Sequence, residues 1–580
     1  MNAITLAERK AQAEAQAAAP VTERLTGAQI VVRLLERQGV RVIAGIPGGA
    51  ILPFYDALSQ SARITHVLAR HEQGAGFMAQ GWSRATGEAA VCAASSGPGA
   101  TNLMTAIADA KLDSIPVVAI TAQVPRAMIG TDAFQEVDTV GMSMPLTKHN
   151  FLVQDTTLLL EVIPRAFSIA LSGRPGPVLV DIPKDVLNET IEVTHWPEPG
   201  CATPRPKPRE RSLERAMEMI AAAKRPVLYL GGGVIHSGAA DEARQFAERL
   251  SLPTTMTLMA LGVLAHDHPL SLGMLGMHAA PFTNLVLEEC DLLMCVGARF
   301  DDRATGKVSA FCPNATIIHV DIDASELNKI KTAKLPIVGD AKSVLSGLLP
   351  RIDPSKHLTD VAWLERVTAL KTAHPLALPD VDNPRSHYGL VRAVAKAAGP
   401  DALVTTDVGQ HQMWTAQAYP FERARQWITS GGLGTMGFGM PAAIGAALAC
   451  PEQIVLCFSG DGSLLMNIQE FATAVECQAN IKVVLMNNNS LGLVNQQQTL
   501  FYGRRIFASR YTAQPDFPAV ARAFGLRALD LDKEADPQAA LAREMATPGP
   551  CLIHASIDVE EHVYPMVPPG AANKDMITGK

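Results

Sequence analysis

Hydrophobic residues along this chain follow two alternating spacings. After Leu25 they recur three and four positions apart within 30–35, which predicts an amphipathic helix. Short runs rich in Val, Ile and Ala then predict strands over residues 42–44, 89–94 and 117–121. Helices that alternate with short apolar strands are typical of βα units around a parallel sheet, so we predict an α/β fold.

The same pattern returns in two later blocks, which divides the chain into three predicted domains. Strands are expected over residues 227–230, 292–296 and 317–320, and again over 404–406, 454–458 and 482–486. Proline-rich stretches without periodicity separate the blocks and are typical of linkers. We therefore predict three doubly wound parallel-sheet domains over 23–190, 211–350 and 385–560, with linkers over 191–210 and 351–384, an N-terminal tail over 1–22 and a C-terminal tail over 561–580.

Composition narrows the class of protein. Apolar residues make up 48% of the 580 positions and charged residues 18%, as in a compact enzyme and unlike a disordered chain. The net charge of −7 is spread without long runs of one sign, so we expect neither a nucleic-acid nor a membrane partner. The nine cysteines form no CxxC pair or Cys/His metal cluster, which favours a cytoplasmic location. No apolar run reaches the roughly 18 residues of a membrane helix.

Two polar turns in the third block predict a cation and phosphate site. Asp461 follows a predicted strand within Gly460-Asp461-Gly462-Ser463, and Asn488 follows the next strand, 27 positions later. Parallel strands joined by a crossover helix bring both side chains to one edge of the sheet. Oxygen ligands suit magnesium on a diphosphate, and the glycines let backbone amides approach phosphate. A lone GDGS is most often a surface turn, so the prediction depends on the spacing of the two turns.

This spacing resembles the signature of thiamine-diphosphate enzymes, and longer strings resemble the acetolactate synthase (acetohydroxyacid synthase) family. The matching strings begin at Gly45 (GIPGGAI), Ser96 (SGPGATN), Met128 (MIGTDAFQE), Ser172 (SGRPGPV), Gly297 (GARFDDR), Asp407 (DVGQHQMW) and Ser430 (SGGLGTMG). The resemblance covers the chain from about residue 23 onward. It implies thiamine diphosphate, Mg²⁺ and FAD as cofactors.

By this resemblance, Glu72 would be the carboxylate that exchanges a proton with the aminopyrimidine ring of thiamine diphosphate. Taken alone, a glutamate at a helix start is more often a solvated capping residue, so its role depends on the distant cation motif. Met436 would wedge the cofactor, and the Gly49 carbonyl would accept a hydrogen bond from the cofactor's amino group. The other cofactor contacts would come from Val408, Gly409, Gln410, His411, Asp461, Gly462, Ser463, Asn488 and Leu493, with Mg²⁺ held by Asp461, Asn488 and the Ser490 carbonyl.

The second block resembles the FAD-binding domain of the family. Its run of three glycines lacks the GxGxxG spacing and by itself would be an ordinary tight turn. The string from Arg299 to Arg303 distinguishes FAD-binding members of the family from FAD-free relatives, which are not expected to carry it. The implied FAD contacts are Arg174, Gly231, Gly232, Gly233, Thr257, Leu258, Met259, Leu275, Gly276, Met277, His278, Gly297, Arg299, Asp301, Arg303, Asp321, Ile322 and Asp340. Because the net reaction transfers no electrons, this FAD would be structural or vestigial.

The resemblance implies decarboxylation of pyruvate and ligation of the remaining two-carbon unit to a second pyruvate or to 2-ketobutyrate. These condensations give 2-acetolactate or 2-aceto-2-hydroxybutyrate, the first common step of valine, leucine and isoleucine biosynthesis. Arg303 would pair with the acceptor carboxylate, while Phe134, Gln135 and Lys184 would border the substrate entrance and the C-terminal tail would cover it. Most family members have tryptophan where this chain has Gln497, so we expect an enzyme that prefers pyruvate more strongly than they do.

Assembly and two rival functions complete the sequence-based expectations. In the family the two halves of the thiamine site come from different subunits, so we expect a homodimer, with a tetramer as the alternative, and a small regulatory subunit. Glyoxylate carboligase shares the fold and FAD but has an apolar residue in place of Glu72. A catalytically silent scaffold subunit would keep the same motifs for folding alone.

Overall fold

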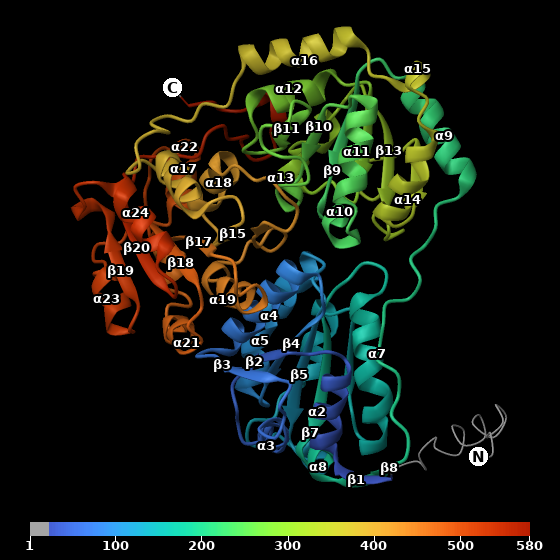
Figure 1. Ribbon diagram of the computed structural model, residues 1–580, viewed down its shortest axis with the longest axis vertical. Coiled ribbons are helices and arrows are strands. Elements are labelled where there is room, and N and C mark those ends of the chain that lie inside the picture. Colours follow the sequence, from blue (N-terminus) through green and yellow to red (C-terminus); the bar gives the residue numbers. More distant parts are fainter. Residues whose placement is uncertain (1–21, 580) are drawn as a thin grey trace, which may run out of the picture.

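The computed structural model describes residues 22–579 and contains three α/β domains (Figure 1). The predicted N-terminal tail therefore lies, except for residue 22, outside the described residues. Each domain is built on a six-stranded parallel sheet flanked by helices, which confirms the predicted fold class. Strands such as β4 and β5 are buried along their whole length because helices cover both faces of the sheet.

The first and third domains have the same topology. Numbered along the chain within each domain, the strands of both sheets lie in the order 2-1-3-4-6-5. The strands of the first domain are β2 (Val42–Gly45), β3 (Thr65–Leu68), β4 (Ala90–Ala94), β5 (Val117–Gln123), β6 (His149–Leu152) and β7 (Val178–Pro183). Those of the third are β15 (Leu403–Thr406), β16 (Trp427–Ile428), β17 (Val455–Gly460), β18 (Ile481–Asn487), β19 (Arg527–Asp530) and β20 (Cys551–Ser556).

The middle domain has a different strand order. Its strands are β9 (Pro226–Leu230), β10 (Thr254–Met256), β11 (Ser271–Met274), β12 (Leu292–Val296), β13 (Thr316–Asp321) and β14 (Leu335–Val338). Along the sheet they follow the order 3-2-1-4-5-6, which is the order of dinucleotide-binding folds. In such sheets a ligand binds where the strand order reverses, which here is the gap between the ends of β9 and β12.

Helices connect these strands in all three domains. The first domain contains α2 (Gly27–Arg37), α3 (Leu52–Leu58), α4 (Glu72–Thr86), α5 (Pro98–Leu112), α6 (Thr139–Ser143), α7 (Leu159–Leu171) and α8 (Lys184–Asn188). The middle domain contains α9 (Glu210–Ala222), α10 (Gly232–Ser237), α11 (Ala240–Leu250), α12 (Pro281–Glu289), α13 (Asp302–Thr305) and α14 (Ala341–Leu348). The third contains α17 (His387–Ala398), α18 (Gln410–Ala418), α19 (Gly439–Ala449), α20 (Asp461–Leu464), α21 (Glu470–Glu476), α22 (Gly492–Phe501), α23 (Phe517–Ala523) and α24 (Pro537–Ala546).

Both predicted linkers contain regular structure that the sequence reasoning overlooked. Strand β8 (Thr190–Val193) pairs antiparallel with β1 (Glu23–Thr26), so the ordered first domain continues beyond residue 190. The segment 351–384 is not irregular throughout, because it forms α15 (Pro354–His357) and α16 (Val361–Ala373). Helix α16 runs along the outer edge of the middle domain and buries Trp363, Val367 and Leu370, whose helical spacing was masked by the surrounding prolines (Figure 1).

The first and third domains are joined through two topologically equivalent helices, α4 and α19. Each follows the second strand of its domain, and the two helices cross in close contact (Figure 1). A Cβ atom at Gly81 would lie 2.0 Å from the Ala442 carbonyl oxygen, and one at Gly445 would lie 1.9 Å from that of Met78. Glycine is therefore required on both helices, and the contact fixes how the two domains face each other.

Two expectations from composition concern cysteines and membranes. All nine cysteines are free thiols, and most of them are buried. Within residues 22–579, no helix combines the length and the apolar character that a membrane span needs.

Candidate active site

The predicted cation ligand Asp461 directly follows β17 and is the first residue of α20. Its side chain is buried and accepts hydrogen bonds from the Gly462 backbone, the Ser490 backbone and the Gln514 amide at 2.9, 3.1 and 2.7 Å. Burial raises the pKa of Asp461 to about 6 despite these donors, because the charged form has lost its hydration. A cation at this carboxylate would offset that cost.

Asn488 lies beside Asp461 at the end of the neighbouring strand β18, as the spacing predicted. Its amide nitrogen donates to the Gln410 side chain at 2.9 Å, so the amide oxygen is the atom free to face a cation. Ser490 is tied to Asp461 through its backbone nitrogen. The candidate donors are thus a carboxylate, an amide oxygen and a backbone carbonyl, a set that fits Mg²⁺.

A tightly packed polar cradle surrounds His411 on the same edge of the third sheet. Cβ atoms at Gly409 and Gly460 would lie 2.6 and 2.8 Å from the imidazole ring, so only glycine fits on either side. The buried Nε2 of His411 has no hydrogen-bond partner among residues 22–579, and burial lowers the pKa of this imidazole to about 3. Ser463 donates to the Val408 carbonyl at 2.9 Å and closes the cradle. An orphaned imidazole nitrogen beside glycine turns suits a diphosphate group.

The first domain presents its predicted residues at the equivalent edge of its own sheet. Glu72 begins α4, is half-buried and accepts a hydrogen bond from Asn102 at 3.0 Å. The turn 95–99 gathers these residues, since Gly48 packs against Ser95 and the Gln135 backbone packs against Gly97. A Cβ atom at Gly99 would lie 3.5 Å from the Glu72 carboxylate, and Gly49 is exposed next to Gly48.

The start of α4 also contacts the third domain of the same chain. The backbone nitrogens of Arg70 and His71 both donate to the Glu470 carboxylate at 2.9 Å. Gln73 accepts from the Asn467 amide at 3.2 Å, and that amide also donates to the Gly437 carbonyl, next to Met436. Residues on either side of Glu72 and Met436 are therefore held together.

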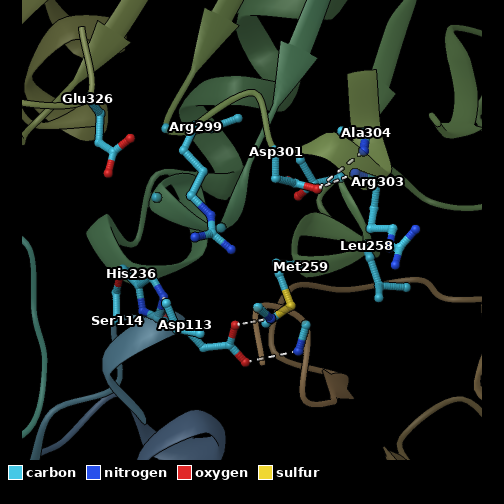
Figure 2. A pocket seen from close by; sticks show the side chains of 18 of the residues that line it. Asp113, Ser114, His236, Leu258, Met259, Arg299, Asp301, Arg303, Ala304 and Glu326 are labelled. Atoms are coloured by element: carbon cyan, nitrogen blue, oxygen red, sulfur yellow. Dashed lines mark hydrogen bonds between the residues drawn. The ribbon is translucent and has the colours of Figure 1, made fainter. Parts of the chain in front are cut away.

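A cavity of about 600 Å³ opens at the reversal point of the middle-domain sheet (Figure 2). Gly233 donates to the Gly297 carbonyl at 3.0 Å, which brings the turns after β9 and β12 together at its floor. Of the predicted FAD residues, the cavity is lined by Arg174, Gly232, Gly233, Thr257, Leu258, Met259, Leu275, Met277, His278, Gly297, Arg299, Asp301, Arg303, Asp321, Ile322 and Asp340. Gly231 and Gly276 lie behind the wall, where they pack against Gly297 and the backbone of residues 303–304.

Charged side chains point into this cavity from several elements (Figure 2). Arg174 pairs with Glu326 at 2.8 Å, and Asp301 caps α13 by accepting from the backbone nitrogens of Arg303 and Ala304. Burial raises the pKa of Asp321, at the end of β13, to about 6. A long cavity with glycine turns at a dinucleotide-type reversal point and charged groups along its walls fits FAD.

The cavity continues toward the third domain and connects the predicted flavin and substrate residues. Arg303 and Gln497 both line it, together with Val408, Leu493 and Met566. The C-terminal tail crosses this region, where Val567 donates to the Met277 carbonyl at 3.0 Å and Val563 pairs with Gln496. Arg303 is 67% exposed, so its guanidinium is accessible to a carboxylate.

Some predicted residues lie apart from this cavity. Gln135 is exposed, Phe134 is 87% exposed, and Lys184 begins α8, all of them in the first domain. The single chain thus contains two half-sites on two sheets.

Sequence reasoning missed the residues that hold the predicted ones in place. Asn102 is the last residue of the SGPGATN string, which resembles the family. Nothing in that string shows that the Asn102 amide donates a hydrogen bond to Glu72. Gln514 lies in an irregular segment and carries no periodic or motif signal, although it contacts Asp461. Only the folded chain reveals such partners.

Comparisons with known proteins agree with this geometry. Three family models match in order: the N-terminal TPP binding domain of thiamine pyrophosphate enzymes over residues 25–142, their central domain over 213–348, and their C-terminal TPP binding domain over 407–555. The chain therefore has the three domains of a thiamine pyrophosphate enzyme, in the same order.

Individual relatives narrow the class further. The chain is 59% identical to acetolactate synthase isozyme 1 large subunit of Escherichia coli, over 96% of this chain and 98% of that protein. It is 46% identical to the isozyme 2 large subunit of the same organism, over 95% and 99%. It is also 46% identical to the acetolactate synthase large subunit of Corynebacterium glutamicum, over 97% and 91%. The chain therefore belongs to the acetolactate synthase large-subunit family.

Proposed function

We propose that this chain is the catalytic subunit of an acetolactate synthase. It decarboxylates pyruvate and joins the two-carbon unit to the keto carbon of a second pyruvate, or of 2-ketobutyrate. The observation that carries this proposal is the pair of half-sites, with Glu72 on one parallel sheet and Asp461 with Asn488 on the topologically equivalent one. Family membership and the cavity that reaches Gln497 support the same function.

The first domain supplies proton transfer. When bound, thiamine diphosphate supplies a carbon nucleophile and an electron sink for the departing CO₂. Glu72 holds and moves a proton at the aminopyrimidine nitrogen, and Asn102 orients its carboxylate through the hydrogen bond at 3.0 Å. Because Glu72 is half-buried, its carboxylate would be accessible to the cofactor ring while it keeps its hydrogen bond from Asn102.

The third domain binds the charged end of the cofactor. Asp461, Asn488 and the Ser490 carbonyl would hold Mg²⁺, and the orphaned His411 nitrogen would meet the diphosphate. The glycine turns beside His411 have no room for a side chain, which keeps the imidazole in place. FAD would occupy the middle-domain cavity without a net redox role, since the reaction transfers no electrons.

The substrate end of the cavity binds and orients the acceptor. We propose that Arg303 pairs with the acceptor carboxylate, and that Gln497 leaves the acceptor pocket without the aromatic face found in most of the family. The extra methyl group of 2-ketobutyrate would therefore make little apolar contact in this pocket, so we expect a preference for pyruvate as the acceptor. Gln135 and Lys184 would border the entrance from the partner subunit.

We propose a homodimer in which each active site uses the first domain of one subunit and the third domain of the other. Apolar side chains beside both half-sites support this arrangement, since Leu52, Phe134 and Met466 are 53%, 87% and 51% exposed in the single chain. The relatives are named large subunits, so a small regulatory subunit is proposed as a further partner. The free cysteines support our proposal of a cytoplasmic location.

Turnover of pyruvate tests the proposed function. With thiamine diphosphate, Mg²⁺ and FAD added, the protein is expected to release CO₂ from pyruvate and form 2-acetolactate, and Glu72→Gln is expected to slow both by about 10²–10⁴-fold. Glyoxylate offered alone separates the carboligase alternative, whose product would be tartronate semialdehyde. Binding of all three cofactors without turnover of any keto acid, with or without a regulatory subunit, would instead identify a silent scaffold.

A further inference from the structure

The loop 429–437, between β16 and α19, lies where all three domains meet. The third domain holds its start, since Gln412 donates to the Thr429 hydroxyl at 2.8 Å and to the Ser430 carbonyl at 3.1 Å. Its far end is held by Asn467, which donates to the Gly437 carbonyl. Between these two points the loop is bonded to side chains of the first domain.

Asp109, on α5, is the first of these side chains. It is fully buried, and its Oδ2 accepts hydrogen bonds from the hydroxyls of Ser430 and Thr435, the latter at 2.7 Å. The Ser430 hydroxyl in turn accepts from the Thr435 backbone nitrogen at 2.8 Å. One carboxylate therefore closes the loop into a fixed ring between Ser430 and Thr435.

Asp113, one turn further along the chain, holds the opposite side of the same loop. Its two carboxylate oxygens accept from the backbone nitrogens of Gly431 and Gly432 at 3.0 and 2.7 Å, as the dashed lines in Figure 2 show. His236 of the middle domain contacts the Asp113 carbonyl at 3.1 Å, and burial lowers the pKa of this histidine to about 4, so it is neutral. All three domains thus meet at Asp113.

Arg84, near the end of α4, links both carboxylates to the backbone of the loop. Its guanidinium donates to Asp109 at 3.2 Å, to Asp113 at 2.8 Å and to the Thr429 carbonyl at 2.9 Å. All three charged side chains are almost completely buried. Burial and the neighbouring Asp113 raise the pKa of Asp109 to about 6. A buried cluster of this kind contributes little net stability, so its value lies in specifying one geometry.

The other face of the loop forms a wall of the middle-domain cavity, which Ser430, Gly431, Gly432, Leu433 and Gly434 all line. A Cβ atom at Gly431 would lie 2.2 Å from the Met259 sulfur, and one at Gly432 would lie 2.9 Å from the Arg299 guanidinium. The loop therefore has no room to move toward the cavity without displacing these two side chains. Met436, which we place against thiamine diphosphate, is on the same loop.

We propose that Arg84, Asp109 and Asp113 are positioning residues that fix loop 429–437 as a wall shared by the flavin cavity and the thiamine half-site. This inference rests on the proposed function, because it assigns those two ligands. A ligand that fills the cavity would lie against the wall formed by Met259, Arg299 and the loop, and would favour the loop geometry that also receives the second ligand. FAD and thiamine diphosphate then strengthen each other's binding, and by linkage the two effects are equal.

Calorimetric titration of the cofactor-free protein measures this coupling directly. Thiamine diphosphate with MgCl₂ is titrated with and without saturating FAD, and FAD is titrated with and without thiamine diphosphate. In the wild type we expect each ligand to lower the Kd of the other by the same factor, at least about 5-fold. In Thr435→Val, which removes one hydroxyl and keeps the side-chain shape, the factor is expected to approach one. Thr435→Ser retains the hydroxyl and should restore the coupling.

A charge-removing variant and a remote control complete the test. Asp109→Asn should lose the coupling and lower kcat more than it raises KM for pyruvate, because a misplaced cofactor reacts slowly. Lys482→Gln removes another buried charge, whose ammonium bonds Thr547 and Gly549 far from the loop, and should lower thermal stability but keep the coupling. Equal coupling in the wild type and Thr435→Val, or no coupling in a wild type that binds both cofactors, would overturn the inference. A wild type that binds neither would contradict the proposed function instead.

Discussion

The first and third domains have the same strand order, yet their sheet edges support different chemistry. In both, the turns after the first and third strands face each other, with 47–49 beside 95–99 in one and 408–411 beside 460–463 in the other. The first edge carries the Glu72 carboxylate, to which we assign proton transfer, and the third carries oxygen atoms that we propose as cation ligands, with the His411 imidazole beside them. Topology therefore decides where a ligand binds, and side chains decide what happens to it.

The middle domain sharpens this comparison, since its strand order differs and its ligand site is of another kind. Its glycine turns meet at a single reversal point and open onto one cavity, whose walls also include Arg174 of the first domain and Gly431 of the third. We propose that the first domain of one subunit and the third domain of another pair to complete the thiamine site, whereas all three domains of one chain line the middle-domain cavity.

The largest expected effects come from substituting one carboxylate in each half-site, because the two carboxylates are proposed to do different things. Glu72→Gln should lower kcat by about 10²–10⁴-fold with little change in cofactor binding, because it removes a proton-transfer group. Asp461→Ala should instead weaken Mg²⁺-dependent cofactor binding. Because Asp461 would bind the metal directly, the loss should exceed the roughly 10–100-fold seen when a residue that only supports a metal ligand is removed. Steady-state kinetics and calorimetry measure the two effects. Glu476→Gln, an exposed glutamate that pairs with Arg70, is the neutral control.

A substitution in the proposed acceptor pocket tests whether the third domain alone sets the choice between 2-ketobutyrate and pyruvate. Gln497→Trp should increase the preference for 2-ketobutyrate over pyruvate by about 10–200-fold, because an aromatic face gains contact with the extra methyl group. Product ratios from mixed substrates measure the change, and condensation of pyruvate with itself serves as the internal control. An unchanged ratio with normal turnover would remove Gln497 from the pocket.

The supporting residues provide a matched pair of smaller effects. Asn102→Ala and Gln514→Ala each remove one hydrogen bond to a carboxylate, a loss of about 1.5–3 kcal/mol, which is roughly 10–150-fold. Asn102→Ala should lower kcat only, and Gln514→Ala should raise the Mg²⁺ concentration needed for cofactor binding. If both variants changed the same parameter, the division of labour between the domains would be wrong.

Substitutions where α4 and α19 cross test whether the first and third domains, which share a topology, also contribute equally to the contact between them. Gly81→Ala and Gly445→Ala should each destabilise the protein by about 1–3 kcal/mol, since the added methyl group would overlap a backbone carbonyl oxygen. Thermal unfolding measures this. Gly347→Ala is the control, because its nearest atom is the end of the flexible Leu213 side chain. Destabilisation by only one of the first two variants would show that the contact is not symmetric.

The smallest expected effect concerns how each domain's stability depends on pH. Burial raises the pKa of Asp181 in the first domain from 3.8 to about 6, so its folded form binds protons more tightly than its unfolded form. Stability therefore falls as pH rises from about 4 to 6. Burial lowers the pKa of Lys482 in the third domain from 10.5 to about 8, so stability falls as pH drops from about 10.5 to 8.

Denaturant unfolding across the pH range measures these slopes in two variants. Asp181→Asn should flatten the acidic slope alone, and Lys482→Gln the alkaline slope alone, each by at most about one proton. A change in the opposite range would show that the titrating group had been misidentified.

Particular residues show how far the sequence reached. Asp461 and Asn488 were placed on adjacent strand ends from spacing alone, and the structure puts them there because parallel strands end at one edge. Helix α16 was overlooked because prolines surround its apolar spacing, and β8 because its partner β1 lies far away in the sequence. Asn102, Gln514 and the buried pair Asp109 and Asp113 carry no local signal, since their partners lie on other elements.

The sequence by itself determined the α/β class, the number of domains and the residue types at the strand ends, because hydrophobic periodicity and turn chemistry are local properties. Only the tertiary structure decided that two domains share a topology, that glycines on α4 and α19 let them meet, and that one loop of the third domain is bonded to the first domain and lines the middle-domain cavity. These features depend on contacts between residues far apart in the chain, such as Asp113 with Gly432, and no local pattern encodes such pairs.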